Sequence, residues 1–509
     1  MLCYNRLKER TGKGFLSEME EEKKPQKKVK PITLDKLPPG TDETLEAEFR
    51  KSRRERRSLP DTIENRELYR DIIQIAWPSL CELFLTSLVS MVDNMMVGNL
   101  GDWAISAVGL ATQPRFIFMN LIMALNTGTT AMISRARGRQ DREKADRILR
   151  QCMVLVTFIG VVSAILGYAL SEPMVRFMAN EGLEPDVLLA GTRYLQVQFL
   201  FFPTLAIAST ITAALKGTGQ AKPSMVYNTI ANLVNICFSW LLINGHWGFP
   251  RLEVVGASIA TGIGQTVALA IALWCVFSGR FYCTMHLKHL LSFEKDTVSG
   301  IVKVGVPSVV EQLFMRVGMI IFTRTVTSLG SVQFATHMIC MNIQSMSFMI
   351  GQGFAVSSTA LVGQSLGKKR PDMAEHYSRR CRNFGLAAAF IIGILFFLFR
   401  RFLVGLYNKD AELLALGSYI MIFVAILQPF QANQFILGGS LRGAGDTRFT
   451  AMVMLITIVG IRTALAYLLV TLLHMELTGA WIAVAADQIA RSLIIMWRYN
   501  TGKWKKIKL

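Results

Sequence analysis

The clearest pattern along the chain is a series of long apolar runs separated by short polar and basic segments. Each run is long enough to cross a bilayer, which takes about 20 apolar residues in a helix. The hydrophobic share of 51% and the charged share of only 18% also favour a polytopic membrane protein over a soluble globular domain. We predict twelve membrane-spanning helices, at 72–98, 104–134, 151–170, 186–215, 223–244, 254–278, 300–328, 333–364, 383–399, 412–439, 449–474 and 478–497.

The second half of the chain repeats the first. A shift of 229 positions places WPSLCELF over VPSVVEQL, so that Pro78 corresponds to Pro307 and Glu82 to Glu311. With the shift reduced to 226, LKGTGQAKP (215–223) lies over LRGAGDTRF (441–449). Each half contains six spans and therefore enters and leaves the membrane on the same side. This predicts an all-α membrane protein of two parallel six-helix lobes.

Charge gives the expected orientation and the domain limits. Lys and Arg are concentrated in the loops after the even-numbered spans and in the C-terminal tail, which predicts that these loops and both termini are cytoplasmic. The net charge of +19 is explained by these loops, so we expect no nucleic-acid partner. We predict a charged, disordered tail at 1–70, with Met19 as an alternative start, a lobe at 71–280, a linker at 281–298, a lobe at 299–498 and a basic tail at 499–509.

Two carboxylates, Glu82 and Asp93, interrupt the first span. A charged carboxylate in the middle of such a helix costs about 2.5–3.5 kcal/mol, so it needs a polar partner or a water-filled cavity. The two acids are 11 residues apart, about three helical turns, and therefore project from the same face. In the second copy Glu311 takes the place of Glu82, but Phe322 takes the place of Asp93. The two lobes are therefore not functionally equivalent.

Four motifs carry a family resemblance. The doubled P-S-x-x-E motif, VDNMMVGNLG around Asp93, ALVGQSLG (360–367) and the paired LKGTGQ and LRGAGDT turns resemble the multidrug and toxic compound extrusion family, over about residues 68–498. The resemblance implies an alternating-access antiporter in the cell membrane, which exports cationic amphiphiles or other organic solutes in exchange for H⁺ or Na⁺. It implies a monomer surrounded by membrane lipids, with a small-molecule substrate and no cofactor besides the coupling ion.

The resemblance also implies roles for particular residues. Asp93 matches the first-span acid that serves as a cation or proton site, and Asn235 matches the fifth-span Asn beside it. Ser239 stands where one branch of the family has a second acid. Glu311 matches a seventh-span acid that another branch uses, whereas its tenth-span companion is replaced by Gln431. The chain combines parts of two ion-site patterns and completes neither.

The coupling ion stays open on physical grounds. Burial of a carboxylate favours its protonated form, so Asp93 can act as a proton carrier. Alternatively, the ionised carboxylate can hold a hard cation together with neutral oxygens from Asn235, Ser239 and Thr261. We favour the proton, because the sequence fixes no coordination cage.

Other polar residues inside the spans are candidates for the substrate cavity, and two prolines are candidates for gating. Interhelical hydrogen bonding explains the amides equally well, and an ion pair with Arg115, Arg316 or Arg324 is the alternative explanation for Glu82. The in-register prolines permit bending of the first span of each lobe. The cavity candidates are Glu82, Gln113, His337, Asn342, Gln344 and Gln431, and the gating candidates are Pro78 and Pro307.

Two other classes of function remain open. A flippase for a lipid-linked precursor, from the same wider superfamily, needs a basic cavity, for which Arg115, Arg316 and Arg324 are available. A receptor or scaffold without transport would leave the acids and the repeat unexplained. We expect no enzymatic activity and no bound metal, because the sequence has no nucleophile–base arrangement, metal-ligand spacing or phosphate loop.

Overall fold

The computed structural model describes residues 65–178, 185–285 and 294–507. Most of the predicted tail (1–70) and the middle of the predicted linker (281–298) lie outside the described residues. Within the described ranges every regular element is a helix. Eleven helices are long and apolar enough to cross a membrane, and a bent pair makes the twelfth span. The predicted all-helical, twelve-span fold is confirmed.

The first lobe has one continuous apolar core, formed by residues from Val97 to Ile301. Long stretches of α4, α5, α8 and α10 contribute to it, which is typical of spans that bury one face against their neighbours. Its helices are α3 (Asn65–Gly98), α4 (Asp102–Gly138), α5 (Arg142–Ala169), α6 (Ser171–Met178), α7 (Pro185–Leu200), α8 (Phe202–Gly217), α9 (Ala221–Asn244), the short η2 (His246–Gly248) and α10 (Glu253–Phe277).

The second lobe follows the same order of spans, with two π-helical segments in its fifth. These segments are η3 and η4, and π-helical turns are found mainly at functional or locally distorted sites. Its helices are α11 (Lys295–Thr327), α12 (Ser331–Gly367), α13 (Pro371–Leu398), α14 (Arg400–Gly405), α15 (Ala411–Gly443), α16 (Thr447–Met454), η3 (Leu455–Arg462), α17 (Thr463–Ala466), η4 (Tyr467–Leu472), α18 (Glu476–Asn500) and η5 (Lys503–Lys506).

The fourth span differs from the single helix predicted at 186–215. The structure divides it into α7 and α8, which meet at Phe201 with a bend of 49°. Pro203 lies in the first turn of α8. Proline has no backbone N–H, so it cannot donate the hydrogen bond that would continue α7 into α8. The proline therefore ends α7 and begins α8.

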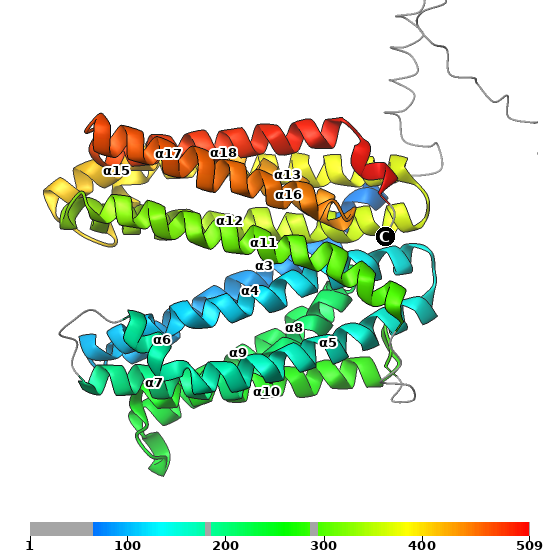
Figure 1. The fold of residues 1–509 in the computed structure, drawn as a ribbon, viewed down its shortest axis with the longest axis horizontal. Coiled ribbons are helices and arrows are strands. Elements are labelled where there is room, and N and C mark those ends of the chain that lie inside the picture. Colours follow the sequence, from blue (N-terminus) through cyan, green and yellow to red (C-terminus); the bar gives the residue numbers. More distant parts are fainter. Residues whose placement is uncertain (1–64, 179–184, 286–293, 508–509) are drawn as a thin grey trace, which may run out of the picture. The chain divides into compact units, whose positions relative to one another are not determined.

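The two lobes meet along α3 and α4 of the first and α11 and α12 of the second. α4 packs against α11 and α12, and α3 packs against α12 (Figure 1). The contact is tightest where α4 and α12 end, because a Cβ atom at Gly138 would lie 2.0 Å from the Gln364 carbonyl oxygen. A Cβ atom at Gly367 would lie 2.2 Å from the Arg135 carbonyl oxygen. Only glycine allows the two backbones to approach this closely.

Hydrogen bonds between the lobes lie at the same end, where the even-numbered spans finish and the Lys- and Arg-rich turns begin. We call it the basic end. Arg135 on α4 donates to the carbonyls of Ala444 (2.8 Å) and Ile507 (3.0 Å) in the second lobe. Gln364 on α12 donates to the carbonyl of Gly217 (3.0 Å) in the first. Arg135 and Gln364 are repeat counterparts, 229 positions apart. Each lobe therefore holds the other by the end of its second span.

The glycine contact gives a first prediction. Gly138→Ala places a methyl group against backbone that cannot move away, so we expect the protein to lose about 1–3 kcal/mol of stability. Gly109→Ala on the same helix is the matched control, because no atom lies within 4 Å of its Cβ position. Thermal unfolding of the purified variants in detergent measures the difference. Equal melting temperatures for the two variants would contradict a tight contact at the basic end.

Candidate functional site

Asp93 lies in a polar cluster between α3 and α9. Asn235 Nδ2 donates to one carboxylate oxygen at 3.1 Å, and Ser239 Oγ donates to the other at 3.0 Å. Ser239 also contacts Asn235 Oδ1 at 2.9 Å. Asn235 and Ser239 are both buried, and their spacing of four residues places them on one face of α9. The structure thus brings together three of the predicted coupling residues.

Thr261, the fourth predicted residue of this cluster, is arranged differently. Its hydroxyl donates to the Ala257 carbonyl of its own helix at 2.9 Å. Among the described hydrogen bonds, none joins Thr261 to Asp93. The second lobe has no equivalent carboxylate, because Phe322 occupies the position of Asp93 with the Arg462 guanidinium 5.6 Å from its ring centre. The cluster is therefore a feature of one lobe, and its role in coupling stays a prediction.

Glu82 lies in a separate cluster nearer the basic end. Lys216 Nζ contacts Oε1 at 2.9 Å, and Asn228 Nδ2 donates to the same oxygen at 3.0 Å. Ser224 Oγ donates to Oε2 at 3.3 Å. The ion pair that we considered for Glu82 from the sequence is present. Its partner is Lys216 from the LKGTGQ turn, however, and not Arg115, Arg316 or Arg324.

Glu311 repeats this arrangement in the second lobe. Arg442 Nη1 contacts Oε1 at 2.9 Å, and Thr450 Oγ1 donates to Oε2 at 2.9 Å. Glu311 is 2% exposed. Arg442 and Thr450 correspond to Lys216 and Ser224 at the shift of 226. Because the same acid, cation and hydroxyl recur in both lobes, each pair forms a link between the first span and the turn after the fourth. The predicted roles of Glu311 in coupling and of Glu82 in the substrate cavity stay predictions.

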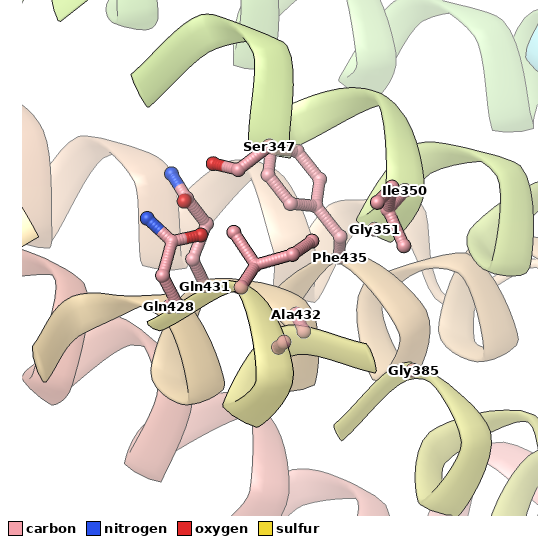
Figure 2. A pocket seen from close by; sticks show the side chains of 10 residues that line it. Ser347, Ile350, Gly351, Gly385, Gln428, Gln431, Ala432 and Phe435 are labelled. Atoms are coloured by element: carbon pink, nitrogen blue, oxygen red, sulfur yellow. The ribbon is translucent and has the colours of Figure 1, made fainter. Parts of the chain in front are cut away.

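The predicted cavity residues fall into two groups. Gln113 and Asn342, which correspond in the repeat, have exposed side chains. Gln344 and Gln431 are buried and carry amide atoms without a hydrogen-bond partner among the described residues. Gln431 lines a small cavity between α12, α13 and α15, and Figure 2 shows its amide beside that of Gln428 and close to Ser347. Their part in substrate binding stays a prediction.

His337, the last cavity candidate, and the two gating candidates have clear structural surroundings. The His337 ring lies 5.6 Å from the rings of both Phe322 and Trp481, inside the second lobe. Pro78 and Pro307 lie inside the long helices α3 and α11, one turn before Glu82 and Glu311. Each proline removes one backbone hydrogen bond just where the ion pair fixes its helix. Their function as gates stays a prediction.

Sequence reasoning missed a buried charge cluster in the second lobe. Asp487 is 0% exposed, and its Oδ2 accepts from Arg462 Nε at 2.9 Å. Its other oxygen accepts from Arg491, whose Nε donates to Thr457 at 3.0 Å. The visible signal was an Asp and an Arg four residues apart in an apolar run, with another Arg in the preceding span. The cluster ties α18 to η3 and carries one more positive than negative charge.

Relatives with known names match most of the length of the chain. The sequence model of the MatE family matches residues 78–241 and 307–468, more than half of the chain. The chain is 27% identical over 440 residues to a probable multidrug resistance protein NorM of Thermotoga maritima, covering 86% of this chain and 94% of the relative. It is 26% identical over 406 residues to the multidrug resistance protein PmpM of Pseudomonas aeruginosa, covering 78% and 83%.

Solved structures show the same fold. A crystal structure of MATE in the bent conformation superposes with a TM-score of 0.80 at 18% identity, covering 86% of this chain and 96% of that one. A transporter of the MOP superfamily from Pyrococcus furiosus, described as having a binding pocket of reversed polarity, gives a TM-score of 0.80 at 19% identity and covers 88% and 100%.

The charge cluster gives a second prediction. Asp487→Asn leaves two buried guanidinium groups without their counter-charge, so we expect a loss of about 3–5 kcal/mol of stability. Asp372→Asn is the control, because that aspartate pairs with Arg370 where both side chains are more than 40% exposed, and such pairs contribute at most about 1 kcal/mol. Unfolding in detergent compares the two, and similar losses would contradict a structural role for the buried cluster.

Proposed function

Because the chain belongs to the MatE family of multidrug and toxic compound extrusion transporters, we propose that it is an antiporter that exports organic solutes in exchange for protons or sodium ions. It is a multi-pass membrane transporter and not an enzyme. The observation that carries the proposal is the Asp93 cluster, a carboxylate held by an amide and a hydroxyl without a contacting cation among the described residues. We place the transporter in the cytoplasmic membrane as a monomer, with both termini inside.

A proton at Asp93 changes the contact between α3 and α9. Both carboxylate oxygens accept hydrogen bonds, one from Asn235 and one from Ser239. A protonated carboxyl gains one O–H donor that needs an acceptor, and its oxygens become weaker acceptors, so we expect these hydrogen bonds to rearrange. A sodium ion would act on the same groups, because the carboxylate, the Asn235 carbonyl oxygen and the Ser239 hydroxyl are hard oxygen ligands. Either ion therefore alters the packing of the first span.

Ion entry is coupled to solute export when the ion and the solute each prefer a different conformer of the transporter. We infer from the positive-inside rule that the basic end is cytoplasmic, and the hydrogen bonds between the lobes support a conformer closed on that side. We propose that the ion enters from outside, favours release of the solute, and leaves after the basic end has opened. Antiport requires only that the ion and the solute bind the two conformers with different affinities.

We propose organic cations with an apolar body as the solutes, as the relatives' names of multidrug resistance proteins suggest. One observation favours a second candidate, a flippase or exporter for molecules with an anionic group. Arg115 and Arg316 each carry a buried Nε without a partner among the described residues. Arg316 also lies 4.8 Å over the ring of Phe116, so it reaches from α11 to α4 across the seam between the lobes.

The third prediction tests the coupling site. In cells that express Asp93→Asn, we expect ethidium efflux to fall to the level of cells without the transporter, because the variant cannot exchange a charge. Glu172→Gln is the control, since that acid is exposed and pairs only with Arg176 on its own helix among the described residues. Membrane abundance of each variant is measured in parallel. Wild-type efflux by Asp93→Asn would remove Asp93 from the mechanism.

The same assay separates the ions and the substrates. Wild-type efflux is measured in vesicles with a proton gradient or a sodium gradient alone, and the gradient that supports efflux names the ion. If neither gradient supports efflux of ethidium, whereas a fluorescent anionic amphiphile is exported, the second candidate replaces the first.

A further inference from the structure

A cavity opens at the basic end, between α4 and α5 of the first lobe and the beginning of α11. It is open to solvent and has a volume of ≈ 200 Å³. Three basic side chains line it, Arg135, Arg139 and Lys144, and one acidic side chain, Glu294. Because it lies where spans end, it faces the level of the lipid headgroups.

The charges of this cavity are not balanced. The carboxylate of Glu294 is already engaged, since it accepts from the Thr297 hydroxyl at 2.7 Å and lies 3.6 Å from Arg147. Arg139 and Lys144 form no ion pair with any described residue. Arg135 is only 7% exposed, and its Nε has no hydrogen-bond partner among the described residues. A buried donor without a partner is costly, and an anion in the cavity would satisfy it.

Apart from Thr297, the rest of the lining has no polar side chain. Met132, Ala136 and Ile148 are all buried and continue the cavity along α4 and α5 toward the membrane core. A small inorganic anion would use only the basic part. An anionic phospholipid would use both, with its phosphate at the basic groups and the beginning of an acyl chain along the apolar side.

The repeat provides an internal comparison. The corresponding place in the other lobe is filled, because the Tyr377 hydroxyl donates to Asp71 there at 2.6 Å. Of the two basic residues that form no described ion pair, only Arg139 has a basic counterpart, Lys368. The counterparts of Lys144, Ile148 and Gly300 are Met373, Tyr377 and Asp71. The open, basic cavity is therefore a property of one seam and not a general result of the fold.

We propose that this cavity binds the phosphate of an anionic phospholipid and that the bound lipid stabilises the conformer closed at the basic end. The stabilising effect of the lipid is inferred from Arg135, whose other two guanidinium nitrogens donate to the carbonyls of Ala444 and Ile507 of the opposite lobe. A phosphate at Nε completes the hydrogen bonding of the same guanidinium that joins the lobes. Because α11 belongs to one lobe and α4 and α5 to the other, the cavity exists only while the lobes are together at this end. The inference does not depend on the identity of the transported solute.

Lipid binding by the full-length protein tests the proposal. Purified protein in detergent is titrated with phosphatidylglycerol, and the bound lipid is counted by native mass spectrometry. Each basic residue near an anionic headgroup contributes about fivefold in affinity, so Arg139→Gln and Lys144→Gln should each weaken one site about fivefold. Lys368→Gln, the exposed repeat counterpart of Arg139, should leave that site unchanged. Arg139 is itself exposed, so its variant is expected to fold.

Further arms separate the possible ligands and test the conformational part. Phosphatidylcholine should not occupy the site, and excess inorganic phosphate should not displace phosphatidylglycerol. Displacement by inorganic phosphate would replace the lipid with a free anion and overturn the proposal, as would equal weakening by Lys368→Gln. In a variant whose native cysteines are replaced, phosphatidylglycerol should also slow labelling of a cysteine placed at Gly219 by a water-soluble thiol reagent, because a Cβ atom there would lie 3.3 Å from the Gln364 amide nitrogen of the opposite lobe in the closed conformer. Unchanged labelling would overturn the stabilising role of the lipid.

Discussion

The turn between the fourth and fifth spans is the element on which both lobes depend. Its basic residue, Lys216 or Arg442, neutralises the glutamate in the first span of the same lobe. A backbone carbonyl of the same turn, at Gly217 or Ala444, accepts from the second span of the opposite lobe. An unpaired carboxylate in a membrane helix costs several kcal/mol, so we expect the turn to stay against its own lobe when the lobes separate. Breaking the hydrogen bond to the carbonyl of Gly217 or Ala444 leaves no buried carboxylate unpaired.

This difference in strength indicates which contacts can break during transport. A neutral hydrogen bond contributes about 0.5–1.5 kcal/mol net and one that involves a charged group about 1.5–3 kcal/mol, whereas breaking a buried ion pair costs about 3–5 kcal/mol. The pairs of Glu82 and Glu311 lie within lobes, and the hydrogen bonds of Gln364 and Arg135 lie between them. Movement of two rigid lobes therefore needs only the weaker class of contact to open. Asp93 is not part of these repeated ion pairs, and its repeat counterpart is Phe322. Its polar contacts are therefore not needed for the contacts that the two lobes share.

The sequence predicted the spans and the repeat well, because membrane thickness fixes the length of an apolar run and a constant shift aligns the two halves. The family resemblance, and not the sequence pattern, implied that Asn235 and Ser239 lie near Asp93, where the structure has them. The sequence did not give the partner of Glu82, since 134 residues separate it from Lys216 and the resemblance drew attention to acids and not to the turn. The break at Phe201 was also missed, although Pro203 was its visible signal, because the apolar run alone has the length of one straight span.

The seam between the lobes adds a constraint that neither repeat unit contains alone. Gly138 and Gly367 bring α4 and α12 into backbone contact, so the two lobes meet in one register at the basic end. On one side of this contact Tyr377 and Asp71 fill the remaining space, and on the other a basic cavity stays open beside Arg135. Equal lobes would close with equal contacts on both sides. The lobes are unequal here, and the anionic lipid that we propose for the basic cavity would stabilise the closed state on that side.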